Sequence, residues 1–465
     1  AHSAREGVDI AIDLLKKYGY FHDGRTYTIA DANEAWQIAI HQGNSWAAHR
    51  IADNEVVYIP NVFMMDKVDL NDKANWRIEP GQVERANKDG RHDAKDPIFN
   101  WRKIVAQQGV RHERWNANRN AIAWKFITGD TFNDPEKYPY SVVPNRKFGV
   151  KDAMTLLRQH EEYIGEDQEL YHSKSEGICR TTSHDSIVYN LTKDPTLTEA
   201  WKTLGRPCQS IFVPLYPLAG PAAGTAFTDP VTATKEHFAG TPAMFDYRAD
   251  FTPHSVFSAS NNAIDYLRGG EIEKRTALIR TEEAKYFAER PAVSEIAATL
   301  TGQARTDYLH AYNQKAYDHA VAVMTAENAR LFTNPVKILA KTVHADQDET
   351  IAFALLGTKD HPVLAAELKP TRAGMSANQL NSTRRFQNFA PAKTMEYKDV
   401  NNDGITDVVF TFDSKALTKG AVAGAKMDLW LYTQVNGHRV TGFDVVPVET
   451  DKVKVSESRD GKGLL

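Results

Sequence analysis

The clearest spacing for chemistry lies in the stretch Asp399 to Asp407, which reads DVNNDGITD. Oxygen donors recur there at the spacing of a calcium loop: Asp399, Asn401, Asp403, Ile405 through its carbonyl, and Asp407. Gly404 permits the sharp turn, but Phe410 stands where an EF-hand has its closing glutamate, and a strand-like run follows. The sequence therefore predicts structural calcium in one of the shorter loops typical of extracellular β modules. The alternative is a hairpin turn without metal.

The sequence contains two cysteines, Cys179 and Cys208. His184 and Asp185 follow Cys179 closely, but a catalytic triad is assembled by the fold, and side chains adjacent along a strand point in different directions. Cysteine that takes no part in chemistry is usually a small buried residue, so we expect Cys179 to be structural. Two cysteines exclude a zinc site of the Cys-x-x-Cys kind, whereas a single disulfide remains open.

Composition excludes several classes of function. The net charge is −4 and the basic residues are scattered, which argues against a nucleic-acid partner. No run of about 18 apolar residues occurs, so we expect no membrane span. We expect a folded, soluble protein, because 42% of residues are hydrophobic and 25% are charged. We also expect no organic cofactor.

The residue pattern of the N-terminal half predicts helices and strands in mixed order. Residues 3–20 form a helical pattern, with Val8, Ala11, Ile12 and Leu15 on one face. Four short runs separated by turn residues predict an antiparallel meander: 26–32, 34–40, 45–51 and 55–61. Residues 71–140 are polar, rich in Trp and loop-like. A helix is expected at 151–164, and strands are expected at 186–191 and 210–216.

The C-terminal half divides near residue 335. Residues 262–332 are rich in Ala, Glu, Lys and Arg at helical spacing, which predicts two or three helices. Short β runs follow at 336–343, 351–356, 407–412, 428–435 and 439–448. We therefore predict an α+β chain with one domain over 1–335 and a β-sandwich-like module over 336–465.

Several segments in order resemble one family. SAREGVD, YTIADANEAWQIAI and SWAAHRIADNEVVYIPNVF follow one another as in the cysteine dipeptidases of the N-terminal-nucleophile (Ntn) hydrolase superfamily. The resemblance continues through DPIFNWRKI, RHERWN, YPYSVVPNRKFGVKDAMTLLRQHEE, GICRTTSHDSIVYNL and GRPCQSIFVPLYPLAG. It fades after the helices that end near Phe332.

The resemblance implies an αββα sandwich and a particular nucleophile. In that family a cysteine at the mature N-terminus attacks the peptide carbonyl, and its own α-amino group acts as the base. Here the first residue is Ala1, and SAREGVD corresponds to a position well inside the family's chain. We expect an N-terminal companion chain, cut from the same precursor, to carry the catalytic cysteine. The alternative is a degenerate or truncated chain without activity.

The resemblance also suggests two site residues. Asn61 matches the position where related hydrolases hold an asparagine against the oxyanion, although a turn asparagine is the alternative. Arg180 resembles the arginine near the nucleophile, where it would lower the thiol pKa and bind a substrate carboxylate. Its alternative is a structural ion pair at the end of a strand.

The expected function is hydrolysis of dipeptides or short peptides by that cysteine. The rivals are hydrolysis of another linear amide and a calcium-stabilised binding or assembly protein without activity. Low-affinity calcium loops suit millimolar calcium, so we expect a periplasmic or secreted protein. Peptide specificity and assembly into a homo-oligomer remain open.

Overall fold

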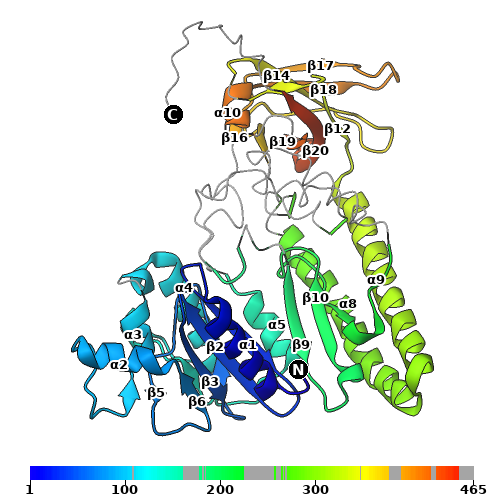
Figure 1. Cartoon of the computed structure of the whole chain (residues 1–465). Coiled ribbons are helices and arrows are strands. Elements are labelled where there is room, and N and C mark those ends of the chain that lie inside the picture. The colour runs from blue at the N-terminus through cyan, green and yellow to red at the C-terminus, as the bar shows by residue number, and fades with distance from the viewer. Residues whose placement is uncertain are drawn as a thin grey trace, which may run out of the picture.

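The computed structural model shows an α+β protein with several separate sheets (Figure 1). The structure describes residues 1–106, 109–160, 177–180, 183, 185–224, 256–257, 263–264, 267, 270–345, 347–375, 389–419, 421 and 426–449. His184 lies outside these residues. Within them, no helix has the length and apolar character needed to cross a membrane.

Helix α1 (Ala4–Tyr18) confirms the first predicted helix. Ser3 caps it by accepting a hydrogen bond from the Glu6 amide at 3.2 Å. Its buried face carries Ala4, Val8, Ile12 and Leu15, which pack in one cluster with Trp36 and other apolar residues of the neighbouring sheet. The 3.6-residue spacing of these side chains is what turns a single face toward the sheet.

The first sheet is antiparallel in the order β1-β2-β3-β6, and its strands are Arg25–Ala30, Ala35–His41, Ser45–Ile51 and Trp76–Ile78. The first three strands follow the predicted meander. The fourth expected strand is wrong, because β4 spans only Val56–Val57 and pairs with β8 (Ser141–Val142). A turn in which the Glu55 amide donates to the Ala52 carbonyl precedes β4, and Pro60 cannot donate to a ladder beyond it.

Residues 71–140 are not a loop, contrary to the prediction. They contain α2 (Pro80–Lys88), β7 (Ile98–Phe99, paired with β5, Val68–Asp69), α3 (Trp101–Val105) and α4 (Arg114–Thr128). Helix α4 was missed because asparagine is a poor helix former. Asn116 and Asn120 are buried instead, where their side-chain amides donate to the carbonyls of Val110 and Asn116 at 3.0 and 3.2 Å.

The second sheet has the order β11-β10-β9, with strands Val213–Leu215, Glu199–Thr203 and Ser186–Asn190. Strand β10 was not predicted. Helix α5 (Val150–Leu157) contacts β9. The predicted helix was too long, because residues 158–160 are not helical, and its last part, from 161 to 164, lies outside the described residues. The long helices α8 (Gly270–Thr299) and α9 (Gly302–Leu331) fall in the expected helical range and contact β11 (Figure 1).

A buried ion pair joins α5 to α8. The Arg158 guanidinium pairs with the Glu283 carboxylate, and both side chains are almost fully buried. Glu283 also accepts a hydrogen bond from the Phe212 amide at 2.9 Å, and Arg158 Nε donates to the Pro207 carbonyl at 2.7 Å. One ion pair therefore ties two helices to the loop that leads from β10 into β11.

A second buried arginine holds the same loop from α8. Arg275 Nε donates to the Gln209 carbonyl at 3.0 Å, and its guanidinium lies 3.2 Å from the Glu327 carboxylate of α9. Burial lowers the pKa of Arg275 to about 10, while Glu327 opposes that shift. The side chain therefore stays charged at neutral pH.

The described residues beyond 335 form two sheets. One has the order β12-β14-β18-β17 (Val336–Ile338, Thr350–Leu355, Asp407–Asp413, Thr394–Lys398). The other has the order β13-β20-β19-β15-β16 (Val343–His344, His438–Glu449, Lys426–Val435, Arg372–Met375, Phe389–Pro391). A short helix, α10, covers Ser414–Thr418. Buried residues between 336 and 448, drawn from both sheets, form one cluster.

Aromatic side chains connect the end of α9 to these sheets. Phe332 lies 6.0 Å from Trp430 and 5.7 Å from Phe443 between ring centroids. Ala263 packs in the same buried cluster. The division of the chain at residue 335 remains a prediction.

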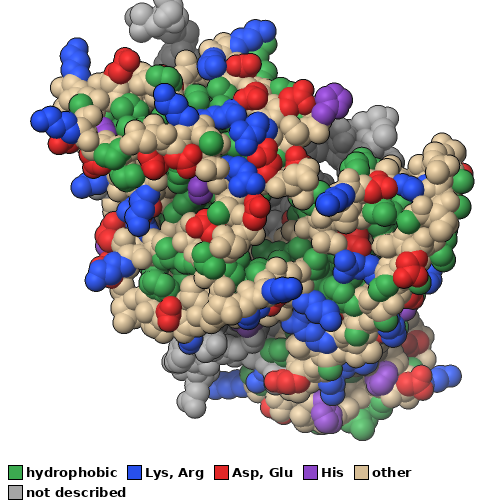
Figure 2. All heavy atoms as spheres, turned by 90° about the horizontal axis from the view of Figure 1, so that it is seen from below, with side chains coloured by type: hydrophobic (Ala, Val, Ile, Leu, Met, Phe, Trp, Pro, Cys, Tyr) green, Lys and Arg blue, Asp and Glu red, His purple; other side chains and the backbone are tan. Residues whose placement is uncertain are grey.

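Charge on the face shown in Figure 2 is mixed, with positive and negative side chains interspersed. This view agrees with the scattered basic residues of the sequence. A strongly basic stripe of the kind that tracks a nucleic-acid backbone is not seen on that face.

Glu283→Ala is expected to lower the free energy of unfolding by about 3–5 kcal/mol, because it leaves the buried Arg158 charge without its partner. Urea unfolding followed by tryptophan fluorescence measures the loss. Glu289→Ala is the matched control on the same helix, since it removes only the exposed pair with Lys315. The control should change stability by less than about 1 kcal/mol. Equal small effects of both variants would contradict this role of Glu283.

Candidate functional site

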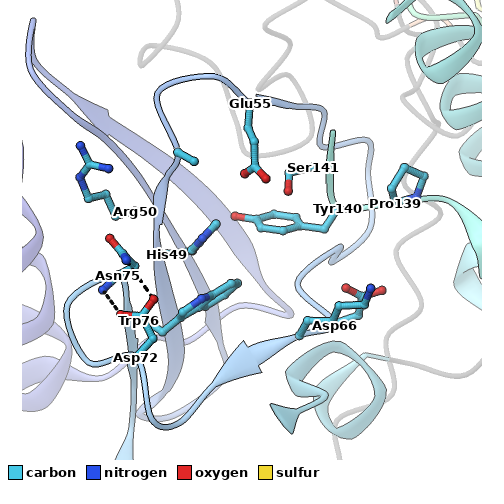
Figure 3. A pocket seen from close by; sticks show the side chains of 12 residues that line it. His49, Arg50, Glu55, Asp66, Asp72, Asn75, Trp76, Pro139, Tyr140 and Ser141 are labelled. Carbon is cyan, nitrogen blue, oxygen red and sulfur yellow. Dashed lines mark hydrogen bonds between the residues drawn. The ribbon is translucent and has the colours of Figure 1, made fainter. Parts of the chain in front are cut away.

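A cavity of about 430 Å³ opens beside the first sheet. Its volume lies within the range of small-molecule sites. Figure 3 shows side chains from β3, from the segment before β6 and from the segment before β8 around one space. The lining residues are His49, Arg50, Ala52, Glu55, Asp66, Lys67, Asp72, Asn75, Trp76, Pro139, Tyr140 and Ser141.

His49 forms the inner wall of the cavity. It is 8% exposed and stacks on Trp76, with ring centroids 3.7 Å apart and planes 15° apart. Its Nδ1 has no hydrogen-bond partner among the described residues. Burial lowers the pKa of His49 to about 4, and the nearby Asp72 carboxylate opposes this shift. The imidazole is therefore neutral at neutral pH, and its Nδ1 is buried without a partner among the described residues.

Tyr140 closes the cavity opposite His49, and Figure 3 shows its ring extending toward the imidazole. Its hydroxyl donates to the Gln37 side-chain oxygen at 3.0 Å. Burial raises the pKa of Tyr140, and the negative charges of Glu55 and Asp66 raise it further. These two carboxylates therefore lie near the same hydroxyl and give this end of the cavity negative potential.

Two other charged residues at the cavity, Arg50 and Asp72, have partners within the protein. Arg50 Nε lies 3.1 Å from Glu34, and its terminal nitrogen lies 2.9 Å from Asp53. Asp72 accepts hydrogen bonds from both the backbone and side-chain nitrogens of Asn75. These contacts fix Arg50 and Asp72 as parts of the wall. An approaching ligand would meet the carboxylates of Glu55 and Asp66 and the ammonium group of Lys67.

Arg180 lies outside the lining of the cavity but close to the strand that borders it. Burial raises the pKa of the Tyr58 hydroxyl, and the positive charges of Arg119 and Arg180 oppose this shift. Tyr58 and the cavity residue Glu55 are separated only by β4, a span of about 10 Å in extended backbone. Arg180 therefore lies near the side chain of Tyr58, the residue that follows β4.

Local contacts position the segment that carries Arg180. The Arg180 amide donates to Ser183 Oγ at 3.1 Å, and the Ser183 amide donates to the Arg180 carbonyl at 2.9 Å. Arg119 Nε of α4 donates to the Gly177 carbonyl at 3.3 Å. These contacts connect the described residues 177–180 and 183 to one another and to α4.

Asn61 does not end a strand, because β4 stops at Val57. Its side chain is exposed, while the neighbouring Ile59 and Val62 pack against a buried cluster. Asn61 does not line the cavity. The catalytic roles suggested for Asn61 and Arg180 remain predictions.

The cysteines are internal, as expected. Cys179 is 1% exposed, which confirms its prediction as a buried residue, and Cys208 is partly exposed. The Cys179 amide donates to the Gln159 carbonyl at 2.7 Å. Neither cysteine lines the 430 Å³ cavity.

The predicted calcium loop connects β17 to β18 as a tight hairpin. The Asp403 amide donates to side-chain oxygens of both Asp399 and Asn401, at 3.3 and 3.2 Å, so these two oxygens converge. Gly404 has φ +82°, a conformation that favours glycine. Asp407 is fully buried and accepts amide hydrogen bonds from Gly357 and Val400, both at 2.9 Å.

The donor set of this loop fits calcium in part. Asp399 and Asp403 are exposed carboxylates beside the Asn401 side-chain oxygen, which are ligands that calcium prefers. Asp407 instead anchors the hairpin to the neighbouring strand. No group of three or more His, Cys, Asp or Glu side chains is arranged to hold a metal ion in the part of the chain that the structure describes.

Sequence reasoning missed the cavity, although one signal for it was present. Gln37 and His49 lie opposite each other in the β2–β3 register, and both are buried among apolar neighbours. A polar pair at inward positions of apolar strands indicates a polar site or a buried hydrogen-bond network. Glu55, Asp66 and Tyr140 come from separate segments, which only the fold brings together.

Residues 1–223 of the 465 match the model of Peptidase family C69, so this part of the chain is similar to that family. A probable dipeptidase of Latilactobacillus sakei is 27% identical over 226 residues, covering 46% of this chain and 47% of that protein. Probable dipeptidase B of Lactococcus lactis is 28% identical over 271 residues, covering 55% and 52%. A probable dipeptidase of Salmonella dublin is 25% identical over 229 residues, covering 46% and 52%.

The chain spans about half the length of the curated relatives it matches. The family match includes His49, Tyr140 and Arg180. It ends before α8, so the long helices and the C-terminal sheets lie outside it.

His49 gives a testable pH dependence. Its pKa in the folded state, about 4, lies below the ordinary 6.5, so the unfolded chain takes up the proton first as the pH falls. The contribution to stability is full above pH 6.5 and is lost between pH 6.5 and about 4, with a magnitude of about 3 kcal/mol. His49→Gln should flatten the pH dependence of the unfolding free energy in that window.

Denaturant unfolding at several pH values measures this effect. His22→Gln is the control, because His22 is exposed. A loss of stability in His49→Gln that is as steep as in the unsubstituted protein would contradict the assignment of a buried, neutral His49.

Proposed function

We propose that this protein hydrolyses dipeptides or short peptides through a cysteine acyl-enzyme. The observation that carries the proposal is the match of residues 1–223 to Peptidase family C69, together with relatives described as probable dipeptidases. A thiolate attacks the peptide carbonyl, the amine leaves, and water then hydrolyses the thioester.

The proposed nucleophile is a cysteine outside these 465 residues, on a companion chain or segment, with its own α-amino group as base. That amine takes the thiol proton and returns it to the leaving amine. The placement of the two cysteines present supports the proposal: Cys179 is buried, and both are internal, so neither offers an α-amino group. Asn61 is the proposed donor to the oxyanion.

Strand β9 supports the docking of further chain. It is an edge of its sheet, and one of its faces packs through Val188 in the same buried cluster as Met154 of α5. The opposite face carries Ile187 and Tyr189, which are 39% and 56% exposed. An open edge and an apolar face are both surfaces that another β layer covers. In the proposed αββα sandwich, that layer includes strands of the companion.

The charges around the cavity suit the two ends of a dipeptide. Glu55 and Asp66 supply negative charge for the α-ammonium group, and the guanidinium of Arg180 supplies positive charge for the α-carboxylate. The span of about 10 Å between the Glu55 and Tyr58 ends of β4 is comparable to an extended dipeptide with its contacts. Arg180 is also proposed to lower the pKa of the incoming thiol.

Arg180→Ala in the native, active protein should lower kcat/KM for a free dipeptide by about 100-fold or more, because it removes a charge-assisted contact to the substrate and thiol. Part of this loss should disappear with the C-terminal amide of the same dipeptide, since that substrate lacks the carboxylate. Arg180→Lys should recover part of the activity on the free dipeptide.

The control is Arg91→Ala, because Arg91 is half exposed and its side chain forms an exposed ion pair with Asp89. It should leave kcat/KM unchanged. Normal specific activity of Arg180→Ala combined with lower stability would assign Arg180 a structural role. Absence of dipeptide hydrolysis by the unsubstituted native protein would contradict the proposed function itself.

We also propose that the loop from Asp399 to Asp407 binds calcium, with Asp399, Asn401, Asp403 and the Ile405 carbonyl as ligands and Asp407 as the buried anchor. The converging oxygens of Asp399 and Asn401 support this proposal. The site is structural and lies far along the chain from the family match. We accordingly propose a periplasmic or secreted location, where calcium is millimolar.

Millimolar calcium should raise the melting temperature of the C-terminal sheets by a few degrees, and a chelator should reverse the shift. Asp403→Ala should abolish both calcium binding in calorimetry and the shift. Asp360→Ala, which changes an exposed carboxylate elsewhere in the same part of the chain, is the control. Unchanged calcium content and melting temperature in Asp403→Ala would show that the loop is only a turn.

A further inference from the structure

The two cysteines are neighbours in space although 29 positions separate them. Their sulfurs lie 3.4 Å apart, with one thiol donating to the other. A covalent S–S bond is about 2 Å long, so closing the gap requires a movement of roughly 1.4 Å. Changes in side-chain torsions and small backbone shifts supply movements of that size.

The buried Arg158 network holds both cysteines in this arrangement. The carbonyl of Gln159, which follows Arg158, accepts a hydrogen bond from the Cys179 amide at 2.7 Å. The Arg158 side chain donates to the carbonyl of Pro207, which precedes Cys208, at 2.7 Å. The backbone at or next to each cysteine is therefore hydrogen-bonded to Arg158 or Gln159. These contacts limit the movement of the two thiols relative to each other.

The surroundings also distinguish the two thiols. Cys208 is the more exposed and lies near the buried Arg275 guanidinium, whose pKa responds to charge on Cys208. Glu327 pairs with the same guanidinium at 3.2 Å and offsets part of its field. A nearby cation favours the thiolate, which is the reactive form, so Cys208 is the thiol that reacts first.

We propose that Cys179 and Cys208 form a disulfide when the protein meets a low-molecular-weight disulfide such as oxidised glutathione. The Cys208 thiolate attacks one sulfur of oxidised glutathione and expels one glutathione thiolate. Cys179 then loses its proton and attacks the Cys208 sulfur, expelling the second glutathione. Two protein thiols are oxidised to one disulfide, and oxidised glutathione is reduced to two thiols.

The disulfide would tie the segment that carries Arg180 to the loop between β10 and β11. Cys179 immediately precedes Arg180, and Cys208 lies within the loop that Arg158 and Arg275 hold. A crosslink that closes a loop of this length restricts the unfolded chain and raises stability. This inference depends on the geometry of the thiols and is independent of the proposed peptidase activity.

The test is incubation of the native protein with oxidised or reduced glutathione, followed by alkylation and peptide mass spectrometry without reduction. The expected product of oxidation is one linked pair of peptides containing Cys179 and Cys208, lighter by two hydrogens than the separate peptides. The melting temperature of the oxidised sample should rise by about 5 °C or more over that of the reduced sample.

Cys179→Ser is the matched control, because under the same oxidation Cys208 should stop at the mixed disulfide with glutathione. If that variant fails to fold, the comparison of oxidised and reduced unsubstituted protein still decides the question. Two alkylated cysteines after oxidation, or glutathione attached to Cys208 without the linked peptides, would overturn the proposal.

Discussion

The buried pair between Arg158 and Glu283 is the interaction on which the arrangement of the family-matched region with α8 depends. It joins residues 125 positions apart, and each charged group also binds backbone of the intervening chain. Glu283 binds the Phe212 amide at the entry to β11, while Arg158 binds the Pro207 carbonyl. A buried charge is costly without a partner, so the helices and this loop must come together in one geometry.

That geometry fixes the candidate site from one side. The carbonyl of Gln159, the residue after Arg158, accepts a hydrogen bond from the Cys179 amide. Arg180 directly follows Cys179, so the ion pair fixes the start of the segment that carries Arg180. Helix α4 fixes the segment from the other side through Arg119 and the Gly177 carbonyl. Arg180 is thereby held near Tyr58, beside the strand that borders the cavity. The same contacts that stabilise the fold therefore also hold Arg180 in place.

Sequence could predict those elements in which apolar spacing is regular. Helix α1 follows from Val8, Ile12 and Leu15, and the first three strands follow from turn residues between alternating runs. Helix α4 could not be predicted in the same way, since Asn116 and Asn120 oppose helix formation and are compensated only by burial and hydrogen bonds. The short β4 shows the converse: of the β-type residues at 55–61, Val56 and Val57 form a strand, and these are the ones that pair with β8.

The candidate site was predictable only where resemblance supplied it. Arg180 and Asn61 were suggested by the segments that resemble the family, and nothing in their local sequence distinguishes a functional role from a structural one. The cavity depends on His49, Glu55 and Tyr140, which are brought together by pairing of β3 with β6 and of β4 with β8. Long-range pairing of that kind leaves little trace in local patterns.

The central claim is that peptide hydrolysis uses a cysteine outside these 465 residues. The most direct measurement is reaction of the native, active preparation with a dipeptide-derived electrophile that alkylates thiols, followed by intact-mass and peptide analysis of every chain present. The account predicts one label on an N-terminal cysteine of a companion chain or segment, in parallel with loss of activity, while Cys179 and Cys208 remain unlabelled. Labelling of Cys179 or Cys208 in proportion to lost activity, or hydrolysis by residues 1–465 alone, would contradict it.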